Sequence, residues 1–352
     1  MPRATREVER DRSGNLHGRL DDLFDASLVS LARAVNAFRE ANSEDVTRLF
    51  LYDLASEDFW PEVAPVSPVA VAFFGDRLRI EISTKRPPEA PERPQLHRVL
   101  APLLRRGNAV MSATRTSEVF GVEEIDLVFA PLTLRANRLR DVYHLAIDAR
   151  DLAEAVLARG ALDAHAIADL VRVRRADLLV GQRESQVFDA KSGYYQLDDD
   201  DGKLELAKDV AAFANTGRSA VIVLGLRTRG DHQGDRVSAA PGLPKERLQP
   251  GRFRQVVASW VYPPPEGMSF LWHGEEKGFL VVLIPSQPSE LQPFLVRRGR
   301  LGRSLSEEQF TLPVRQGEDT SYRDIGRLHS LLVAGRAALA GPGSDLPTCP
   351  QE

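Results

Sequence analysis

Cysteine is nearly absent from this 352-residue chain, since Cys349 is the single example. One cysteine excludes an internal disulfide framework and a thiolate metal cluster within one chain, and a reducing compartment is expected. Long apolar runs are missing too, because no stretch reaches the roughly 18 uninterrupted apolar residues of a membrane span. Residues 1–12 are charged and precede no apolar run, so we expect no secretory signal. These absences together predict a cytoplasmic protein without membrane contact.

An excess of positive charge is also missing. The chain has 46 Lys and Arg residues against 50 Asp and Glu, which gives a formal net charge of −4. Coating nucleic acid by bulk electrostatics needs a strongly basic face, so any binding must use a local patch. Only six of the basic residues are lysine. Arginine suits phosphate recognition through its planar donor fork, but its excess along the whole chain decides nothing by itself.

Residues 1–150 are predicted to form an α+β domain. A stripe of apolar residues at steps of three and four from Leu20 to Phe38 indicates the first helix. Gly75-Asp76-Arg77 is a plausible hairpin turn, and residues 86–94 form a proline-rich loop. No chemical motif is found in this part. The other expected elements are strands at 46–54, 69–74, 78–83, 108–113, 125–129 and 142–147, and a helix at 96–106.

Residues 151–340 are predicted to form a second domain, of α/β type with a mixed sheet. Helical spacing over residues 151–179 leads into it, and residues 341–352 have the composition of a disordered tail. The fold class is therefore mixed α+β, in two domains. The expected elements are strands at 185–190, 220–226, 279–285 and 294–298, and helices at 204–215, 252–261 and 322–339.

Residues from about 177 to 312 resemble the Schlafen AlbA domain. That family has a Glu-Ser start, an acidic-x-Lys strand, an Ala-Phe-Ala-Asn-Thr helix end, a Gly-containing strand, an apolar strand ending in Ile-Pro, and an Arg-Gly strand. The resemblance implies a domain that binds RNA or DNA without a cofactor, in regulation or defence. The matching segments are Arg183–Lys191, Val210–Gly217, Val221–Gly225, Phe279–Ser286 and Phe294–Gly299.

Two carboxylates and a lysine form the candidate catalytic site. Asp189 and Lys191 share one face of a strand, while Glu184 lies on the opposite face or in the preceding loop. If the chain bends there, the cluster would hold Mg²⁺ or Mn²⁺ through its oxygens and activate water for phosphodiester cleavage. The simpler alternative is an exposed strand end with an ion pair between Asp189 and Lys191.

The resemblance bears on this site in two ways. Nuclease-active Schlafen proteins are thought to use an acidic trio, of which two members map onto Glu184 and Asp189. The third falls just after the Gly-containing strand, where residues 226–229 read Leu-Arg-Thr-Arg and contain no acid. A metal-dependent ribonuclease is therefore the alternative to a protein that binds without cutting, with Lys191 stabilising the developing phosphate charge.

Several arginines are candidates for phosphate contacts. Four of them fall in one seven-residue segment, which is expected to form a strand and its turn. The surrounding stretch from Leu291 to Leu305 contains no acidic residue. Arg218 stands where the family has consecutive glycines, which puts a backbone phosphate cradle in doubt while offering a guanidinium instead. A solvated turn is the alternative. The candidates are Arg218, Arg227, Arg229, Arg297, Arg298, Arg300 and Arg303.

Asn215, Thr216 and Gly217 are expected to end a helix. Glycine adopts the left-handed conformation that closes a helix. Asn215 then makes either a cap or turn hydrogen bond, or holds a catalytic carboxylate or a phosphate.

Other motifs fail. No Gly-x4-Gly-Lys-Ser/Thr phosphate loop occurs, no histidines pair at zinc-ligand spacing, and no Gly-x-Ser-x-Gly elbow is present. The acidic run Asp198–Asp201 is expected to be a solvated loop, or less simply a cation attractor. The leading hypothesis is a nucleic-acid-binding protein whose residues 1–150 recognise another protein; the alternatives are the ribonuclease and a protein-interaction module without either activity.

Overall fold

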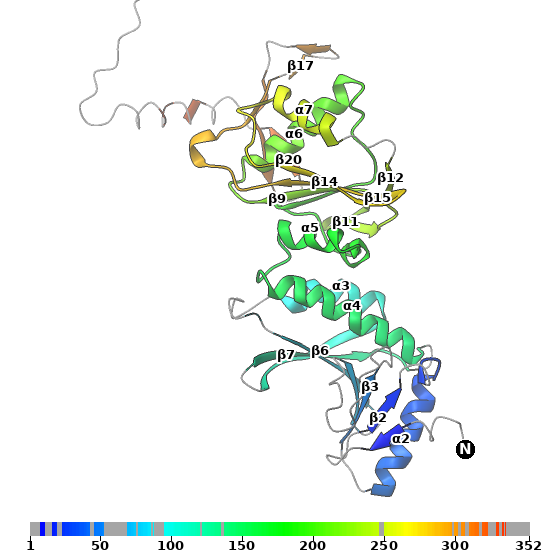
Figure 1. Ribbon diagram of the computed structural model, residues 1–352. Helices are drawn as coiled ribbons and strands as arrows, with labels where there is room; N and C mark the ends of the chain where they lie inside the picture. The colour runs from blue at the N-terminus through cyan, green and yellow to red at the C-terminus, as the bar shows by residue number, and fades with distance from the viewer. Residues whose placement is uncertain are drawn as a thin grey trace, which may run out of the picture. The chain divides into compact units, whose positions relative to one another are not determined.

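By its internal contacts, a computed structural model of the chain divides into two compact units, residues 1–182 and residues 183–352, called here the N-terminal and C-terminal units (Figure 1). Residues 151–182 make their contacts within the N-terminal unit, whereas the sequence predicted a boundary near 150. The structure describes residues 8–10, 16–19, 23–42, 46–52, 69–74, 77–85, 87, 95–119, 122–134, 137–245, 250–297, 299–301, 304–306, 310–316, 319–322, 329–330, 333 and 335.

A seven-stranded sheet forms the N-terminal unit, in the order β1-β2-β3-β4-β5-β7-β6. Strands β2 and β3 are parallel, and the other neighbours are antiparallel. Helices α3 and α4 pack against the sheet, α3 on β6 and α4 on β4 and β5. The elements are β1 Val8–Arg10, β2 Leu16–Arg19, α2 Leu28–Asn42, β3 Val46–Tyr52, β4 Val69–Phe74, β5 Arg77–Lys85, α3 Leu96–Arg106, β6 Ala109–Val119, β7 Val122–Pro131, α4 Leu139–Leu157, α5 Ala164–Arg172 and the short 3₁₀ helix η2 Ala176–Leu179.

The strand predicted at residues 142–147 is wrong, because this segment lies inside helix α4. Val142, Ala146 and Ala149 are all buried, at steps of four and three, which is the spacing of one helix face. A six-residue window is too short to separate this period from a strand. The N–H of Arg138 donates to the Asp141 side chain at the start of the helix, 3.0 Å away, and so favours helix at this position.

The first helix begins later than its apolar stripe predicts. Helix α2 starts at Leu28 because the Ser27 hydroxyl accepts the N–H of Ser30, at 3.1 Å, and caps the first turn. The remaining predicted strands and the helix at 96–106 have counterparts in the N-terminal unit, whereas most of the turn at 75–77 and the loop at 86–94 lies outside the described residues.

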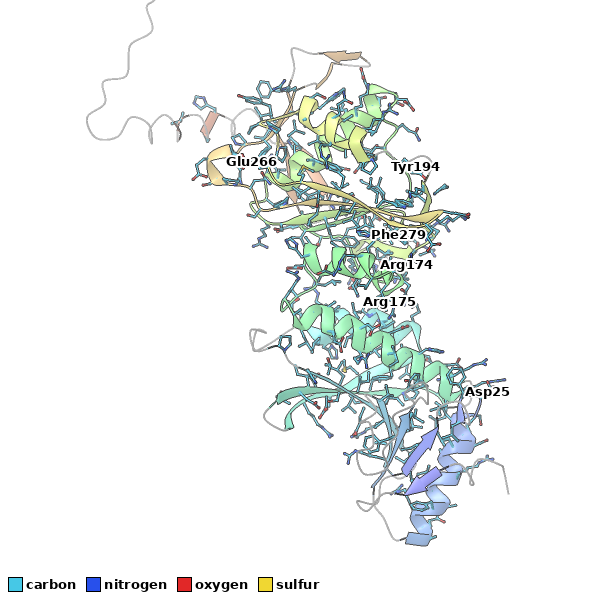
Figure 2. All side chains as sticks on the ribbon, viewed as in Figure 1. Asp25, Arg174, Arg175, Tyr194, Glu266 and Phe279 are labelled. Carbon is cyan, nitrogen blue, oxygen red and sulfur yellow. The ribbon has the colours of Figure 1, made fainter. Side chains whose placement is uncertain are left out.

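An arginine joins α4 to the segment that follows α5. The side chain of Arg175, labelled in Figure 2, contacts the carboxylates of Asp148 and Asp151 in α4 and of Asp177 in η2. Burial raises the pKa of Asp148, against the charge of Arg175. Residues 151–177 are thereby tied to the rest of the N-terminal unit.

The C-terminal unit is built on a mixed sheet. Strand β8 runs parallel to β9, β15 is antiparallel to β9, and β14 and β12 both pair with β15. In Figure 1, helices α6 and α7 lie over this sheet. The elements are β8 Phe188–Lys191, α6 Asp200–Ala214, β9 Ala220–Leu224, β10 Arg227–Asp231, β11 Gly234–Ala239, β12 Leu243–Pro244, α7 Pro250–Trp260, β13 Val261–Tyr262, β14 Ser269–Gly274, β15 Lys277–Ile284, the 3₁₀ helix η4 Ser289–Leu291, β16 Leu295–Val296, β17 Gly299–Leu301, β18 Ser304–Ser306, β19 Pro313–Gln316 and β20 Asp319–Tyr322.

The core of this unit lies between α6, α7 and the sheet. Every residue of β9 is buried, as its continuous apolar run predicted for a central strand. Phe213 of α6 and Phe253 of α7 belong to the same buried cluster as Ile222 of β9. Mixed α and β structure is therefore confirmed.

Two predictions for the C-terminal part concern residues with little or no description. The helix predicted at 322–339 and the tail at 341–352 lie largely outside the described residues. Strands β19 and β20, which pair as a hairpin just before that segment, were not predicted.

Candidate functional site

The predicted carboxylates and lysine meet in a cluster that we call the buried charge network: Glu184, Asp189, Lys191, Asp209 and Arg315. Asp189 and Lys191 lie in β8, and the lysine Nζ is 3.2 Å from Asp189 Oδ2. Glu184 precedes the strand, and its Oε1 accepts the N–H of Ala190 at 3.2 Å. The chain thus bends so that both predicted carboxylates approach one site.

Arg315 reaches the network from β19 and was not anticipated by the sequence analysis. Its Nη2 donates to Asp189 Oδ1 at 2.9 Å and lies 3.7 Å from Glu184 Oε2. Its guanidinium carbon stands 4.7 Å from the centre of the Phe213 ring. The arginine and Asp189 side chains are each only 3% exposed, so their ion pair is hidden from solvent.

Lys191 extends the network to helix α6. Its Nζ is 3.1 Å from Asp209 Oδ2, the same oxygen that accepts the Tyr195 hydroxyl at 2.6 Å. Asp189 Oδ2 has no hydrogen-bond partner among the described residues, so its 3.2 Å approach to Lys191 is an electrostatic contact rather than an aligned hydrogen bond. The lysine therefore bridges two carboxylates that would otherwise repel each other.

Burial controls the proton equilibria of this network. Burial, with a contribution from the charge of Asp189, raises the pKa of Glu184 to about 8. Burial raises the pKa of Asp209 as well, against the charge of Lys191. For Lys191, burial lowers the pKa, but the charges of Asp209 and Asp189 outweigh it and the net shift is upward. At neutral pH, Glu184 therefore holds its proton and Lys191 is charged.

These contacts bear on the predicted metal site at Glu184 and Asp189. A divalent cation there would have to displace the guanidinium of Arg315 and the proton on Glu184. Within the described part of the chain, no group of three or more His, Cys, Asp or Glu side chains is arranged to hold a metal ion. The donor set in this conformation fits the arginine better than a divalent cation.

Asp209 and Arg315 belong to the network but were not predicted as site residues, and only Asp209 has a recognisable sequence pattern. Asp209 lies on the same face of α6 as Leu206 and Phe213, both fully buried, so it is a carboxylate in an apolar stripe. Such a residue needs a buried partner. Arg315 offers no such local signal, because it belongs to a four-residue strand far along the chain.

Asn215 joins three segments rather than contacting the carboxylates directly. Its Nδ2 donates to the carbonyl oxygens of Phe294 and Pro313, both at 2.9 Å, and its Oδ1 accepts the N–H of Phe294 at 2.7 Å. Pro313 begins β19, the strand of Arg315. Thr216 and Gly217 complete the helix end, where the Thr216 hydroxyl donates to the Phe213 carbonyl and Gly217 has a φ of +70°.

Replacing Asn215 with alanine is expected to lower the free energy of unfolding by about 2–3 kcal/mol, because three hydrogen bonds disappear and a backbone N–H loses its acceptor. Asn215→Asp keeps an acceptor for Phe294 but turns a carboxylate oxygen towards the two carbonyl oxygens, and should cost at least as much as alanine. Urea denaturation followed by tryptophan fluorescence measures both. A loss below about 0.5 kcal/mol for alanine would contradict this role.

The acidic run Asp198–Asp201 is largely exposed, as expected of solvated charges, but it leads into helix α6 rather than forming a loop throughout. The Asp199 side chain accepts the N–H of Gly202 at 2.7 Å, and Asp200 and Asp201 lie in the first turn, where negative charge is favourable. Asp198 pairs with Arg252 at 2.6 Å. The run therefore has a structural role in capping the helix.

The candidate arginines are not all brought together. Arg218 precedes β9 and Arg227 follows it, so they lie at opposite ends of a strand about 13 Å long. Arg227 and Arg229 belong to β10 and are exposed. Arg297 is exposed and stacks on the Tyr262 ring, 5.0 Å from its centre.

The rest of the predicted arginine patch has little or no description. Arg298 and Arg303 lie outside the described residues, and only the backbone of Arg300, in β17, is described. A groove that collects every candidate arginine is therefore not seen among the described side chains.

Among the described residues, no helix is long and apolar enough to cross a membrane.

Comparison with known proteins identifies no relative. No family model matches the chain, and no curated protein matches it.

Proposed function

We propose that this protein binds nucleic acid, RNA or DNA, through exposed arginines of its C-terminal unit. The observation that carries the proposal is the contrast between its buried and exposed charges. Arg315 and Lys191 neutralise carboxylates inside the buried charge network. On the surface, Arg218, Arg227 and Arg229 form no ion pair with any residue that the structure describes. Exposed guanidinium groups without counter-charges are suited to phosphate.

The resemblance to Schlafen AlbA domains supports this proposal. Three of the resembling segments are carried by β8, β9 and β15, and the central strand β9 pairs with both of the others. The helix-end motif has a physical purpose, since Phe213 stacks on Arg315 and Asn215 holds the start of β19. The three strands and the helix end are therefore parts of one connected unit, which supports reading the segments together.

Binding without cleavage is favoured over the ribonuclease alternative. Cleavage through Glu184 and Asp189 with Mg²⁺ or Mn²⁺ needs carboxylates that are open to a cation and to the scissile phosphate. Their side chains are 8% and 3% exposed, and Arg315 contacts both. A nuclease would therefore require β19 to move away from this site.

The test is to mix the purified chain with labelled tRNA and duplex DNA, first with Mg²⁺ or Mn²⁺ and then with EDTA. We expect salt-sensitive binding in both conditions and no fragments. If three arginines neutralise phosphates, the slope of log K against log salt is about −2.7, so affinity falls about 40-fold from about 50 to about 200 mM salt.

Other outcomes select the alternatives. Cation-dependent fragments that Glu184→Ala abolishes would establish the ribonuclease. Absence of both binding and cleavage at low salt would reject nucleic acid as the ligand and leave a protein-interaction module.

For the rest of the molecule, we propose that the N-terminal unit recognises a protein partner and that the protein acts in the cytoplasm, in regulation or defence. A single cysteine supports a reducing compartment. The seven-stranded sheet of this unit carries no chemical motif that would give it a catalytic role of its own.

A further inference from the structure

The hairpin of β10 and β11 is an unusual element of the C-terminal unit. It forms a two-stranded sheet of its own. Val237 is its only buried residue. An isolated two-stranded hairpin is marginal in water, and one with so little apolar burial needs other support.

Arg183 supplies that support. Its Nη1 and Nη2 donate to the two oxygens of Asp231, at 2.9 and 2.8 Å, and Nη1 also donates to the Gly234 carbonyl at 3.1 Å. The N–H of Glu184 donates to the Asp235 carbonyl at 3.0 Å. The hydrogen bond from Arg183 holds the pKa of Asp231 well below its usual range. A bidentate ion pair thus fixes the turn of the hairpin onto the strand-like segment at residues 183–184.

The same geometry aligns three arginines on one face. Arg229 stands directly opposite Arg236 in the β10–β11 register, and Arg183 forms a β-bridge with Arg236 on its other side. Residues that face each other across strands share a face, with Cβ atoms about 4.5–5.5 Å apart. Asp231, two residues after Arg229, lies on that face too. On this face, the carboxylate of Asp231 is therefore the counter-charge for a row of three guanidinium groups.

That row has a positive charge that the hairpin does not compensate. Asp231 is engaged by Arg183, and its distance to Arg236 is 3.9 Å. Arg229 has no ion-pair partner among the described residues. Like charges directly opposite on a sheet are destabilising, so the pairing of Arg229 with Arg236 lowers the stability of a hairpin that already buries little. An anion between them would remove that repulsion.

We infer that the β10–β11 hairpin is a phosphate-binding arm in which Arg229 and Arg236 clamp the phosphodiester backbone, with Arg183 and Asp231 holding the arm in shape. This inference rests on the proposed function and adds Arg236 to its binding residues. Arg227, exposed on β10 beyond a β-bulge, carries positive charge further along the strand. Two residues of strand span about 6.6 Å, so Arg227 can contact a different phosphate from the one held by Arg229 and Arg236. A chain of phosphates matches this arrangement better than a single small anion.

The test compares the wild-type chain with Arg229→Ala/Arg236→Ala, using fluorescence anisotropy of labelled single-stranded RNA and labelled duplex DNA over a range of salt. The double variant is expected to bind about tenfold or more weakly, with a slope of log K against log salt that is less steep by about 1.8 on duplex DNA and about 1.4 on single-stranded RNA. Comparing the loss of affinity for RNA with the loss of affinity for DNA shows which of the two nucleic acids the arm binds.

Two controls make the result specific. Arg105→Ala/Arg172→Ala removes the same charge from exposed positions of the N-terminal unit and is expected to bind as the wild type does. Arg229→Lys/Arg236→Lys keeps the charge and should keep most of the salt slope while losing affinity, because lysine lacks the bidentate fork. Circular dichroism checks that each variant is folded.

The outcomes separate this inference from the proposal it rests on. If the wild type binds and the double alanine variant binds equally well with an unchanged slope, the arm is rejected and nucleic-acid binding by other arginines stands. If the wild type does not bind either probe at low salt, both are rejected.

Discussion

Replacing Arg315 with alanine is expected to lower the free energy of unfolding of the C-terminal unit by about 3 kcal/mol, because buried Asp189 is then left with Lys191, which it shares with Asp209, as its counter-ion. The Asp189 side chain is 3% exposed in the folded chain, and its Oδ1 accepts its hydrogen bond from Arg315. The same change removes the cation stacked on Phe213. Urea denaturation measures the loss, and the fluorescence of Trp260 and Trp272 reports on this unit.

An exposed ion pair provides the matched control. Arg252 pairs with Asp198, whose side chain is 86% exposed, and Arg252→Ala should cost below about 1 kcal/mol. Asp189→Asn combined with Arg315→Met removes both charges and should recover part of the loss. Equal costs for Arg315→Ala and Arg252→Ala would show that Arg315 is not a partner that the folded state requires.

Replacing Glu184 with glutamine is expected to flatten the pH dependence of stability between about pH 4.5 and 8. In the folded state the pKa of Glu184 is raised to about 8 from an ordinary value of 4.5. The folded chain then holds a proton that the unfolded chain releases, so the stabilising contribution of Glu184 is complete below about pH 4.5 and is lost as pH rises through the window. The fall is at most about 1.4 kcal/mol per pH unit. Because the glutamine amide does not titrate, the free energy of unfolding of the variant should fall less over the same pH range.

Urea denaturation at about pH 5, 6.5 and 8 tests this expectation. Some pH dependence of the same sign should persist in Glu184→Gln, because burial also raises the pKa of Asp209. Glu290→Gln changes an exposed glutamate and should follow the wild-type profile. Parallel profiles for Glu184→Gln and the wild type would show that Glu184 titrates normally in the folded chain.

Local patterns predicted the elements whose environment is set by neighbouring residues. The continuous apolar run at residues 220–226 predicted a buried central strand, and β9 is one. The Asn-Thr-Gly sequence predicted a helix end, which it forms at the close of α6. The two-residue spacing of Asp189 and Lys191 allowed an ion pair as one alternative, and the pair forms, although Asp189 is buried rather than at an exposed strand end. In each case the partners are a few residues apart, so the spacing alone limits the geometry.

The same local patterns failed where a short window fitted two periods or where a cap moved a boundary. Residues 142–147 were predicted as a strand because six residues do not distinguish alternation from one face of a helix. The acidic run at 198–201 is largely exposed as expected, but it was predicted as a loop because its capping role depends on the helix that it starts. These errors arise from the length of the window rather than from the residue preferences.

The sequence by itself determined the mixed α and β composition, the central strand and the helix end. Only the tertiary structure decided what the carboxylates do, because Arg315 lies 126 residues from Asp189 and no local period connects them. It also aligned Arg183, Arg236 and Arg229 through the register of β10 and β11 and a β-bridge. Spacing along a chain limits which near neighbours share a face, whereas contacts between distant segments depend on how the whole core packs.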